Sequence, residues 1–226
     1  MHDTRRRFHE DLEKLERQAL GALDLVLGQL DRALQAVSDH DVDLAGLVIA
    51  DDVRIDGRFL DVHQGALSLL ARQAPVAGDL RMIVALLHTI QCIERMGDQC
   101  ANIAKLVPLS AEPAPKDREI LDAIEGMGRL ARHLVSETRL AFKSRHVSLA
   151  RGLAGEGAGI GWLSRQVFGR ALEIGDDAGV REWAMLMILV ARALERITNN
   201  AIEIADQTVF VVTGRFRESP GASPAA

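Results

Sequence analysis

The chain has 226 residues, of which 48 % are hydrophobic and 26 % charged, and its formal net charge at pH 7 is -5. This composition is typical of a globular protein, and the acidic balance provides no broad basic surface for binding nucleic acid. No apolar run reaches the roughly 18 residues that a membrane-spanning helix needs, and the charged N-terminal segment is unlike a signal peptide, so a cytoplasmic location is expected.

Three long helices are predicted in the first half. From Phe8 to Val37 apolar residues recur at steps of three and four, the spacing that turns one stripe of a helix toward its neighbours. Asp39 and Asp41 are both suited to cap a second helix, which ends before Pro75 because proline disrupts a helix interior. The same period returns over residues 80–104 and predicts a third helix.

The second half repeats this organisation. A proline-rich linker is predicted at residues 111–115, because prolines there separate two periodic segments. Gly214 is a natural helix stop. Three further helices are expected, at Ile120–Ala141, at Leu149 to about Leu172 and at Trp183 to about Val212.

The two halves also match in sequence. A shift of 101 positions lays Glu94-Arg95 on Glu195-Arg196, and such self-similarity indicates a duplicated unit. No segment shows the alternation typical of a strand. The sequence therefore predicts an all-α protein of two tandem three-helix bundles with six long helices. The expected division is a first repeat at 1–110, the linker at 111–115, a second repeat at 116–214 and a disordered tail at 215–226.

Acidic residues lie four apart on two of the predicted helices. Glu94 and Asp98 leave one face of the third helix, and Asp52 and Asp56 repeat this arrangement on the second, where Asp51 interrupts the apolar stripe. Converging carboxylates repel unless protons, basic side chains or a hard cation neutralise them. All-oxygen ligation suits Mg, Mn, Ca or iron. From the spacing alone, a solvated acidic face remains the simpler interpretation.

Catalytic motifs are not found in the sequence. The Glu-x-x-His pairs of ferritin-type di-iron enzymes, a Gly-x-Ser-x-Gly elbow, a P-loop and a Gly-x-Gly-x-x-Gly turn are all missing. Cys92 and Cys100 lie too far apart on one helix to pair with each other and are interpreted as buried free thiols. A non-enzymatic role is expected.

Four segments of the sequence carry a family likeness: QAPVAGDLR at 73–81, IERMGDQCANIA at 93–104, LERITNNAIEIA at 194–205 and VVTG at 211–214. They resemble the PhoU family of phosphate-uptake regulators, and the resemblance covers nearly the whole chain. Within the first segment, Asp79 and Arg81 are interpreted as capping and pairing at the start of the third helix. The resemblance implies two tandem three-helix bundles, homodimerisation and metal sites built from Glu/Asp-x-x-x-Asp pairs.

The resemblance also implies particular metal ligands for iron, Zn, Mn or Mg. In the second repeat Asn199 matches Asp98, and Gly157 and Gly161 match the acidic residues of the second helix. Because an amide binds a hard cation less well than a carboxylate, a weak or missing site is predicted there. The glycines of this run also favour a kink or close helix packing. The implied ligands are Asp52, Asp56, Glu94 and Asp98, with Asp51, Glu195 and Asn199 as weaker candidates.

By this resemblance the chain is a negative regulator. It is expected to restrain the phosphate-specific ABC transporter and its sensor histidine kinase when phosphate is plentiful, reaching the membrane only through these partners. The alternative is a helical-bundle adaptor or dimerisation protein with no metal role. A metal-dependent phosphatase is a third interpretation, although no acid, base or nucleophile stands out in the sequence.

Overall fold

A computed structural model describes residues 2–110 and 116–215, and these residues form six long α-helices and one short 3-10 helix. No strand occurs among them, and the predicted all-α class with six helices is confirmed. The predicted linker, and the predicted tail except residue 215, lie outside the described residues. The elements are α1 (His2–Asp39), α2 (Val42–Arg72), α3 (Ala77–Leu106), η1 (Val107–Leu109), α4 (Arg118–Ser144), α5 (Val147–Glu173) and α6 (Ala178–Thr213).

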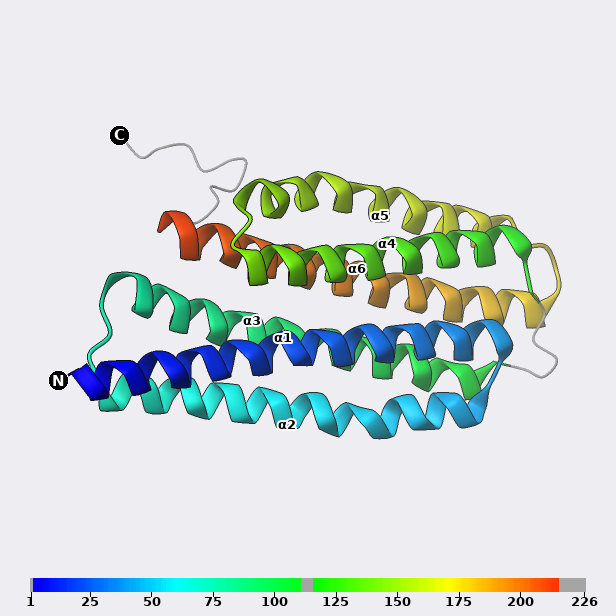
Figure 1. The fold of residues 1–226 in the computed structure, drawn as a ribbon. Coiled ribbons are helices and arrows are strands. Elements are labelled where there is room, and N and C mark those ends of the chain that lie inside the picture. Colours follow the sequence, from blue (N-terminus) through cyan, green and yellow to red (C-terminus); the bar gives the residue numbers. More distant parts are fainter. Residues whose placement is uncertain (1, 111–115, 216–226) are drawn as a thin grey trace.

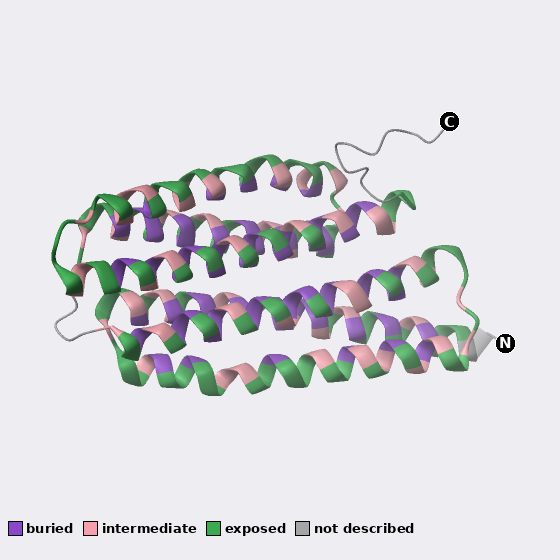
Figure 2. Ribbon diagram, turned by 180° about the vertical axis from the view of Figure 1, so that it is seen from behind, coloured by how far each residue is buried: buried purple, intermediate pink, exposed green. Residues whose placement is uncertain are grey.

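The helices pack as two antiparallel bundles of three that lie side by side (Figure 1). Helices α3 and α6 run next to each other between the bundles, and α1 packs against α4. Helices α2 and α5 lie on the outside, and Figure 2 shows their exposed outer faces. Among the described residues, no helix is long and apolar enough to cross a membrane. The largest fully buried side chains include Leu23, Leu30, Ile55, Ile83, Leu86, Ile90, Ile93, Met96, Ile103, Ile120, Met127 and Phe142.

Local sequence determines several helix ends. Of the two predicted caps, Asp41 is the one that caps α2, because its carboxylate accepts a hydrogen bond from a backbone N–H of the first turn at 2.8 Å. Asp39 is instead the last residue of α1. Helix α6 begins at Ala178 rather than at the expected Trp183, since Asp177 provides a cap of the same kind. Helix α6 ends at Thr213, and Gly214 is its C-cap with a left-handed φ of 72°, so this predicted stop is confirmed.

The predicted cap of α3 is wrong. The N-cap residue is Val76, which provides no side-chain hydrogen bond. Asp79 lies inside the first turn, where a negative charge complements the helix dipole, and its carboxylate faces the imidazole of His9 at 3.4 Å. The Arg81 guanidinium reaches the second bundle and donates to the carbonyl of Val211 at 3.4 Å.

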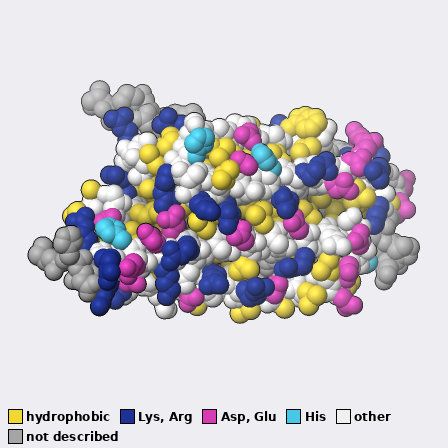
Figure 3. Space-filling model, viewed as in Figure 1, with side chains coloured by type: hydrophobic (Ala, Val, Ile, Leu, Met, Phe, Trp, Pro, Cys, Tyr) yellow, Lys and Arg dark blue, Asp and Glu magenta, His cyan; other side chains and the backbone are white. Residues whose placement is uncertain are grey.

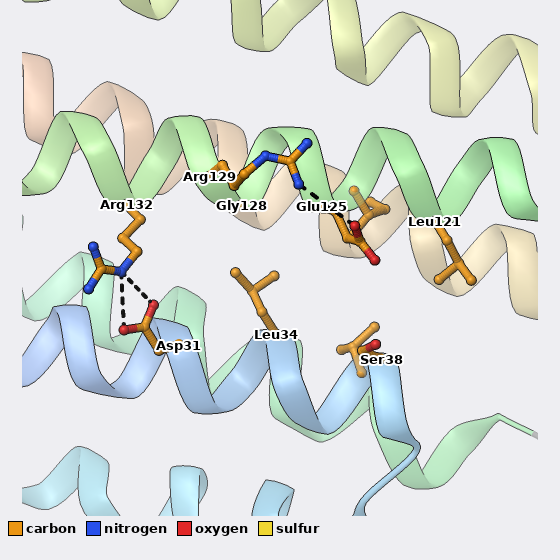
Figure 4. A pocket seen from close by; sticks show the side chains of 10 residues that line it. Asp31, Leu34, Ser38, Leu121, Glu125, Gly128, Arg129 and Arg132 are labelled. Atoms are coloured by element: carbon orange, nitrogen blue, oxygen red, sulfur yellow. Dashed lines mark hydrogen bonds and ion pairs between the residues drawn. The ribbon is translucent and has the colours of Figure 1, made fainter.

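A groove of about 230 Å³ lies at the seam between α1 and α4. Figure 3 shows apolar atoms along this seam with Lys, Arg, Asp and Glu side chains interspersed around it. Inside the groove Leu34 projects toward α4, and a Cβ at Gly128 would lie only 2.6 Å from its Cδ1 (Figure 4). Arg132 donates to both carboxylate oxygens of Asp31, at 2.9 and 3.2 Å. The groove contains none of the predicted metal ligands.

Asp117 joins the start of α4 to α5. One carboxylate oxygen accepts hydrogen bonds from the backbone N–H groups of Glu119 and Ile120, both at 3.1 Å. The other accepts from Nε and Nη2 of Arg170, at 3.0 and 2.8 Å. The hydrogen bond from Arg170 is the main reason that the pKa of Asp117 lies below its ordinary value.

We expect Asp117→Ala to lower the free energy of unfolding by about 1 to 2 kcal/mol at pH 7, because a helix cap is lost. Since folding lowers the pKa of Asp117, its stabilisation is complete above the ordinary value of 3.8 and is lost as pH falls through the folded-state pKa. Urea unfolding at pH 7 and in acid measures both effects. Asp122→Ala is the control, because the exposed pair of Asp122 with Arg118 contributes less than about 0.5 kcal/mol. Equal losses in both variants would contradict the capping role.

Candidate functional site

The four principal candidate ligands lie where α2 packs on α3, but no three of their carboxylates have oxygens within 4.8 Å of one another in the described structure. Asp52 and Glu94 are partly buried, whereas Asp56 and Asp98 are exposed. A Cβ placed on Gly97 would lie only 2.9 Å from Oδ1 of Asp52. The Asp52 carboxylate therefore rests against the backbone of α3 at Gly97, which lies between Glu94 and Asp98 in the sequence. A side chain at position 97 would occupy this space.

Burial and neighbouring negative charges both raise the pKa values of Asp52 and Glu94. Burial is the main reason that the pKa of Asp52 is raised, and the charges of Asp56 and Asp98 raise it further. A hydrogen bond from Nε2 of Gln29, at 3.3 Å, acts in the opposite direction. The pKa of Glu94 is also raised, first by burial and then by Asp98 and Asp56. Both acids therefore favour a proton or a cation beside them.

Asp51 lies in a different environment from these four residues. Its carboxylate accepts a hydrogen bond from Arg32 of α1 at 2.7 Å and lies 3.6 Å from the guanidinium of Arg54. Two cationic side chains already neutralise this acid, so it has less need of a metal ion. Asp51 also ties α2 to α1, which accounts for a charged residue in the apolar stripe.

The second repeat does not reproduce the acidic arrangement. Glu195 accepts a hydrogen bond from Arg192 at 2.8 Å, and Asn199 is exposed. Gly157 occupies the position that corresponds to Asp52, and a Cβ there would lie 2.5 Å from Cδ1 of Ile202. An apolar side chain of α6 therefore comes to the place where the first repeat has a carboxylate. The glycine permits close packing of α5 on α6, one of the two effects expected from this run.

A third constellation lies between the two bundles and was missed by the sequence analysis. Cys92 donates a hydrogen bond from Sγ to Oε2 of Glu203 at 3.4 Å, and Nε2 of His88 lies 3.6 Å from the same oxygen. Among the described residues, this is the one group of three or more His, Cys, Asp and Glu side chains whose ligand atoms all lie within 4.8 Å of one another. The spacing of His88 and Cys92 on α3 was visible in the sequence, but their partner is 111 positions from Cys92.

Both cysteines are buried and neither forms a disulfide, so the prediction of free thiols is confirmed. Burial raises the pKa of the Cys92 thiol to about 12, and the neighbouring Glu203 carboxylate adds to the effect. Burial also raises the pKa of Cys100. In the metal-free protein neither thiol forms a nucleophilic thiolate at neutral pH.

Comparisons of the sequence with known proteins all match one family. A family model described as the PhoU domain matches residues 20–107. The chain is 30 % identical over 217 residues to "Phosphate-specific transport system accessory protein PhoU homolog 1" of Mycobacterium leprae, covering 93 % of this chain and 95 % of that protein. It is 31 % identical over 216 residues to PhoU homolog 2 of Mycobacterium tuberculosis, covering 92 % and 98 %.

Solved structures give the same result for the fold. The crystal structure of the phosphate transport system regulatory protein PhoU from Streptococcus pneumoniae superposes with a TM-score of 0.86 and 25 % sequence identity, covering 94 % of this chain and 100 % of that chain. The crystal structure of PhoU from Pseudomonas aeruginosa gives a TM-score of 0.85, also at 25 % identity.

Proposed function

Because this chain belongs to the PhoU family, we propose that it is an accessory regulator of phosphate uptake. It restrains a phosphate-specific ABC transporter and the sensor histidine kinase of phosphate-starvation genes when phosphate is plentiful. The observation that carries this proposal is a likeness over more than nine-tenths of the length of relatives named as phosphate-specific transport accessory proteins. The regulator acts by binding, and we propose no enzymatic step.

Metal binding by the first repeat is part of the proposal. Asp52 and Glu94 hold the ion, and Asp56 and Asp98 complete an all-oxygen set suited to Mg, Mn or iron. The fit is supported by the acidic groups themselves, whose burial and repulsion call for positive charge, and by Gly97, which leaves room for the α2 carboxylate. The cation supplies that charge and ties α2 to α3.

The two repeats are proposed to differ in this respect. We place the first repeat at 1–110 and the second at 116–214, with metal held by the first. The arginine partner of Glu195 and the packing of Ile202 against Gly157 support this asymmetry. Elemental analysis of tag-free protein measures it, and equal occupancy of both repeats would contradict it.

Deleting the gene tests the regulatory function. In phosphate-rich medium we expect phosphate uptake and starvation-gene expression to rise, because the restraint on transporter and kinase is removed. Returning the wild-type gene lowers both uptake and expression to their original levels, whereas returning a variant with Asp52→Asn and Glu94→Gln does not. Uptake and expression that stay unchanged after deletion would show that the chain does not regulate phosphate uptake.

A second candidate function, dimerisation or adaptor binding, is supported by an apolar stripe on α2. Its members follow one another at intervals of seven, four, seven and seven residues, the spacing of a coiled-coil seam. We propose that this α2 stripe contacts a second copy of the chain, since one stripe can pair with itself across a two-fold axis. The α2 stripe consists of Val42, Ile49, Val53, Leu60 and Leu67, which are 37–68 % exposed.

We expect a variant with Val53→Glu and Leu60→Glu to be monomeric at concentrations where the wild-type chain is dimeric. Two carboxylates in an apolar contact lose hydration and repel their symmetry mates. Sedimentation or light scattering measures the mass of both proteins. Leu172→Glu, at a 73 % exposed position on α5, is the control and leaves the dimer intact. A monomeric wild-type chain, or a double variant that still dimerises, would contradict the proposal.

A further inference from the structure

The group formed by His88, Cys92 and Glu203 differs in chemistry from the acidic cluster of the first repeat. It offers one imidazole nitrogen, one sulfur and one carboxylate oxygen, all within 4.8 Å of one another. Sulfur and imidazole ligands select zinc over magnesium and calcium, which prefer oxygen. Charge balance agrees, because a thiolate and a carboxylate together neutralise a divalent cation beside a neutral imidazole.

The distances between the donor atoms suit a tetrahedral centre. Zinc bonds of about 2.3 Å to sulfur and 2.0 to 2.1 Å to nitrogen and oxygen, at tetrahedral angles, place sulfur about 3.5 Å and nitrogen about 3.3 Å from the oxygen. The observed separations are 3.4 Å from Cys92 Sγ to Glu203 Oε2 and 3.6 Å from His88 Nε2 to the same atom. The donor atoms of His88 and Cys92 lie within 4.8 Å of each other, and a bound ion would draw this pair toward the same tetrahedral separation.

We propose that His88, Cys92 and Glu203 form a zinc site that bridges the two repeats. His88 and Cys92 lie one turn apart on α3, so both face α6, which provides Glu203. The two helices run side by side between the bundles (Figure 1). Bound zinc links the first repeat to the second through their central helices.

The three donor residues differ in exposure. Cys92 is fully buried, whereas the side chains of His88 and Glu203 are 42 % and 48 % exposed. Solvent therefore reaches the imidazole and the carboxylate, and the sulfur is the buried ligand. Three protein ligands leave the fourth tetrahedral position to water on the exposed side.

Cobalt and zinc titrations of metal-free protein test the proposal. Wild-type protein with Co²⁺ is expected to show the visible bands of a tetrahedral centre and a near-ultraviolet thiolate-to-metal charge-transfer band. In Cys92→Ala the charge-transfer band disappears, and in both Cys92→Ala and Glu203→Gln the affinity for Zn²⁺ falls at least about tenfold. A hundredfold excess of Zn²⁺ over its Kd raises the melting temperature of the wild-type chain by roughly 5 to 10 °C.

The controls separate this site from other metal binding. Glu156→Gln removes a carboxylate from a similar exposed pair with His133, in which the two groups lie 2.9 Å apart without a thiol, and it keeps wild-type affinity. The acidic cluster contains no sulfur and gives no charge-transfer band. Glu203→Gln alters a half-exposed position and so keeps the fold if Cys92→Ala does not. A wild-type chain without the band, or either site variant with wild-type Zn²⁺ affinity, would overturn the proposal.

Discussion

Changing Asp52 and Glu94 to their amides is expected to abolish metal binding by the first repeat and, in the metal-free chain, to raise the free energy of unfolding. Each change removes one member of a like-charged i,i+4 pair, which together predicts a gain of about 0.5 to 1 kcal/mol at neutral pH. Relief of the burial of two charged groups acts in the same direction. The residues proposed to bind the cation therefore destabilise the chain that lacks it.

The gain depends on pH in a defined direction. Folding raises the pKa of both acids above their ordinary values of 3.8 and 4.5. They favour folding in acid, and this contribution is lost as pH rises through the folded-state pKa values. The stability advantage of the amide variant should therefore be near zero below pH 4 and increase toward neutrality. Urea unfolding with chelator at several pH values measures it, and elemental analysis measures the metal.

A variant with Asp122→Asn and Glu125→Gln is the matched control. It changes the net charge by the same amount, but each of these carboxylates pairs with an arginine on the exposed face of α4. We expect it to keep its metal and to gain no stability. If the control gained as much as the site variant, net charge rather than the acidic cluster would be the cause. If the site variant kept its metal, the assignment of the ligands would be wrong.

Gly97→Ala is expected to damage the same site without changing any charge. The new Cβ would meet Oδ1 of Asp52 and Cδ1 of Ile55, each at 2.9 Å, and Ile55 is fully buried. The crowding costs about 1 to 3 kcal/mol, which opposes a gain of about 1 kcal/mol from replacing glycine in a helix. Metal affinity should fall at least about tenfold, because the Asp52 carboxylate must move.

Gly155→Ala separates the two contributions. Gly155 is also in a helix, α5, and a Cβ there meets no atom within 4 Å. It should gain the helix propensity alone, so the difference between the two variants measures the steric cost. Thermal unfolding reports it at about 2 to 4 °C for each kcal/mol in a chain of this size. Equal stability of the two variants would show that α2 and α3 can separate at Gly97 without cost.

The fold was predictable because its determinants are local. Recurring apolar residues predicted the helices of the first half, the same organisation was found again in the second, and Asp41 and Gly214 marked two helix ends correctly. The prediction that Asp79 caps α3 was wrong because a carboxylate is favourable both at the N-cap and in the first turn of a helix. The sequence alone could not decide between these positions, and Val76 is the actual cap.

The candidate sites also differ in how local their residues are in the sequence. Each acidic pair of the first repeat lies within one helix, so spacing was enough to find it, although not to show that the pairs interact. Glu203 belongs to another bundle from His88 and Cys92, and only the packing of α3 on α6 brings it to them. Asp51 was predicted as a weaker ligand because its ion pair with Arg32 of α1 depends on helix packing and is not visible in the nearby sequence.

The packing of Ile202 against Gly157 makes the two bundles differ in their response to charge. The contact between α5 and α6 is apolar there, whereas the corresponding contact between α2 and α3 contains acids whose protonation and repulsion depend on their surroundings. A cation bound at the proposed acidic site would therefore change the forces inside the first bundle alone, whereas zinc at the proposed site between α3 and α6 would act on both bundles.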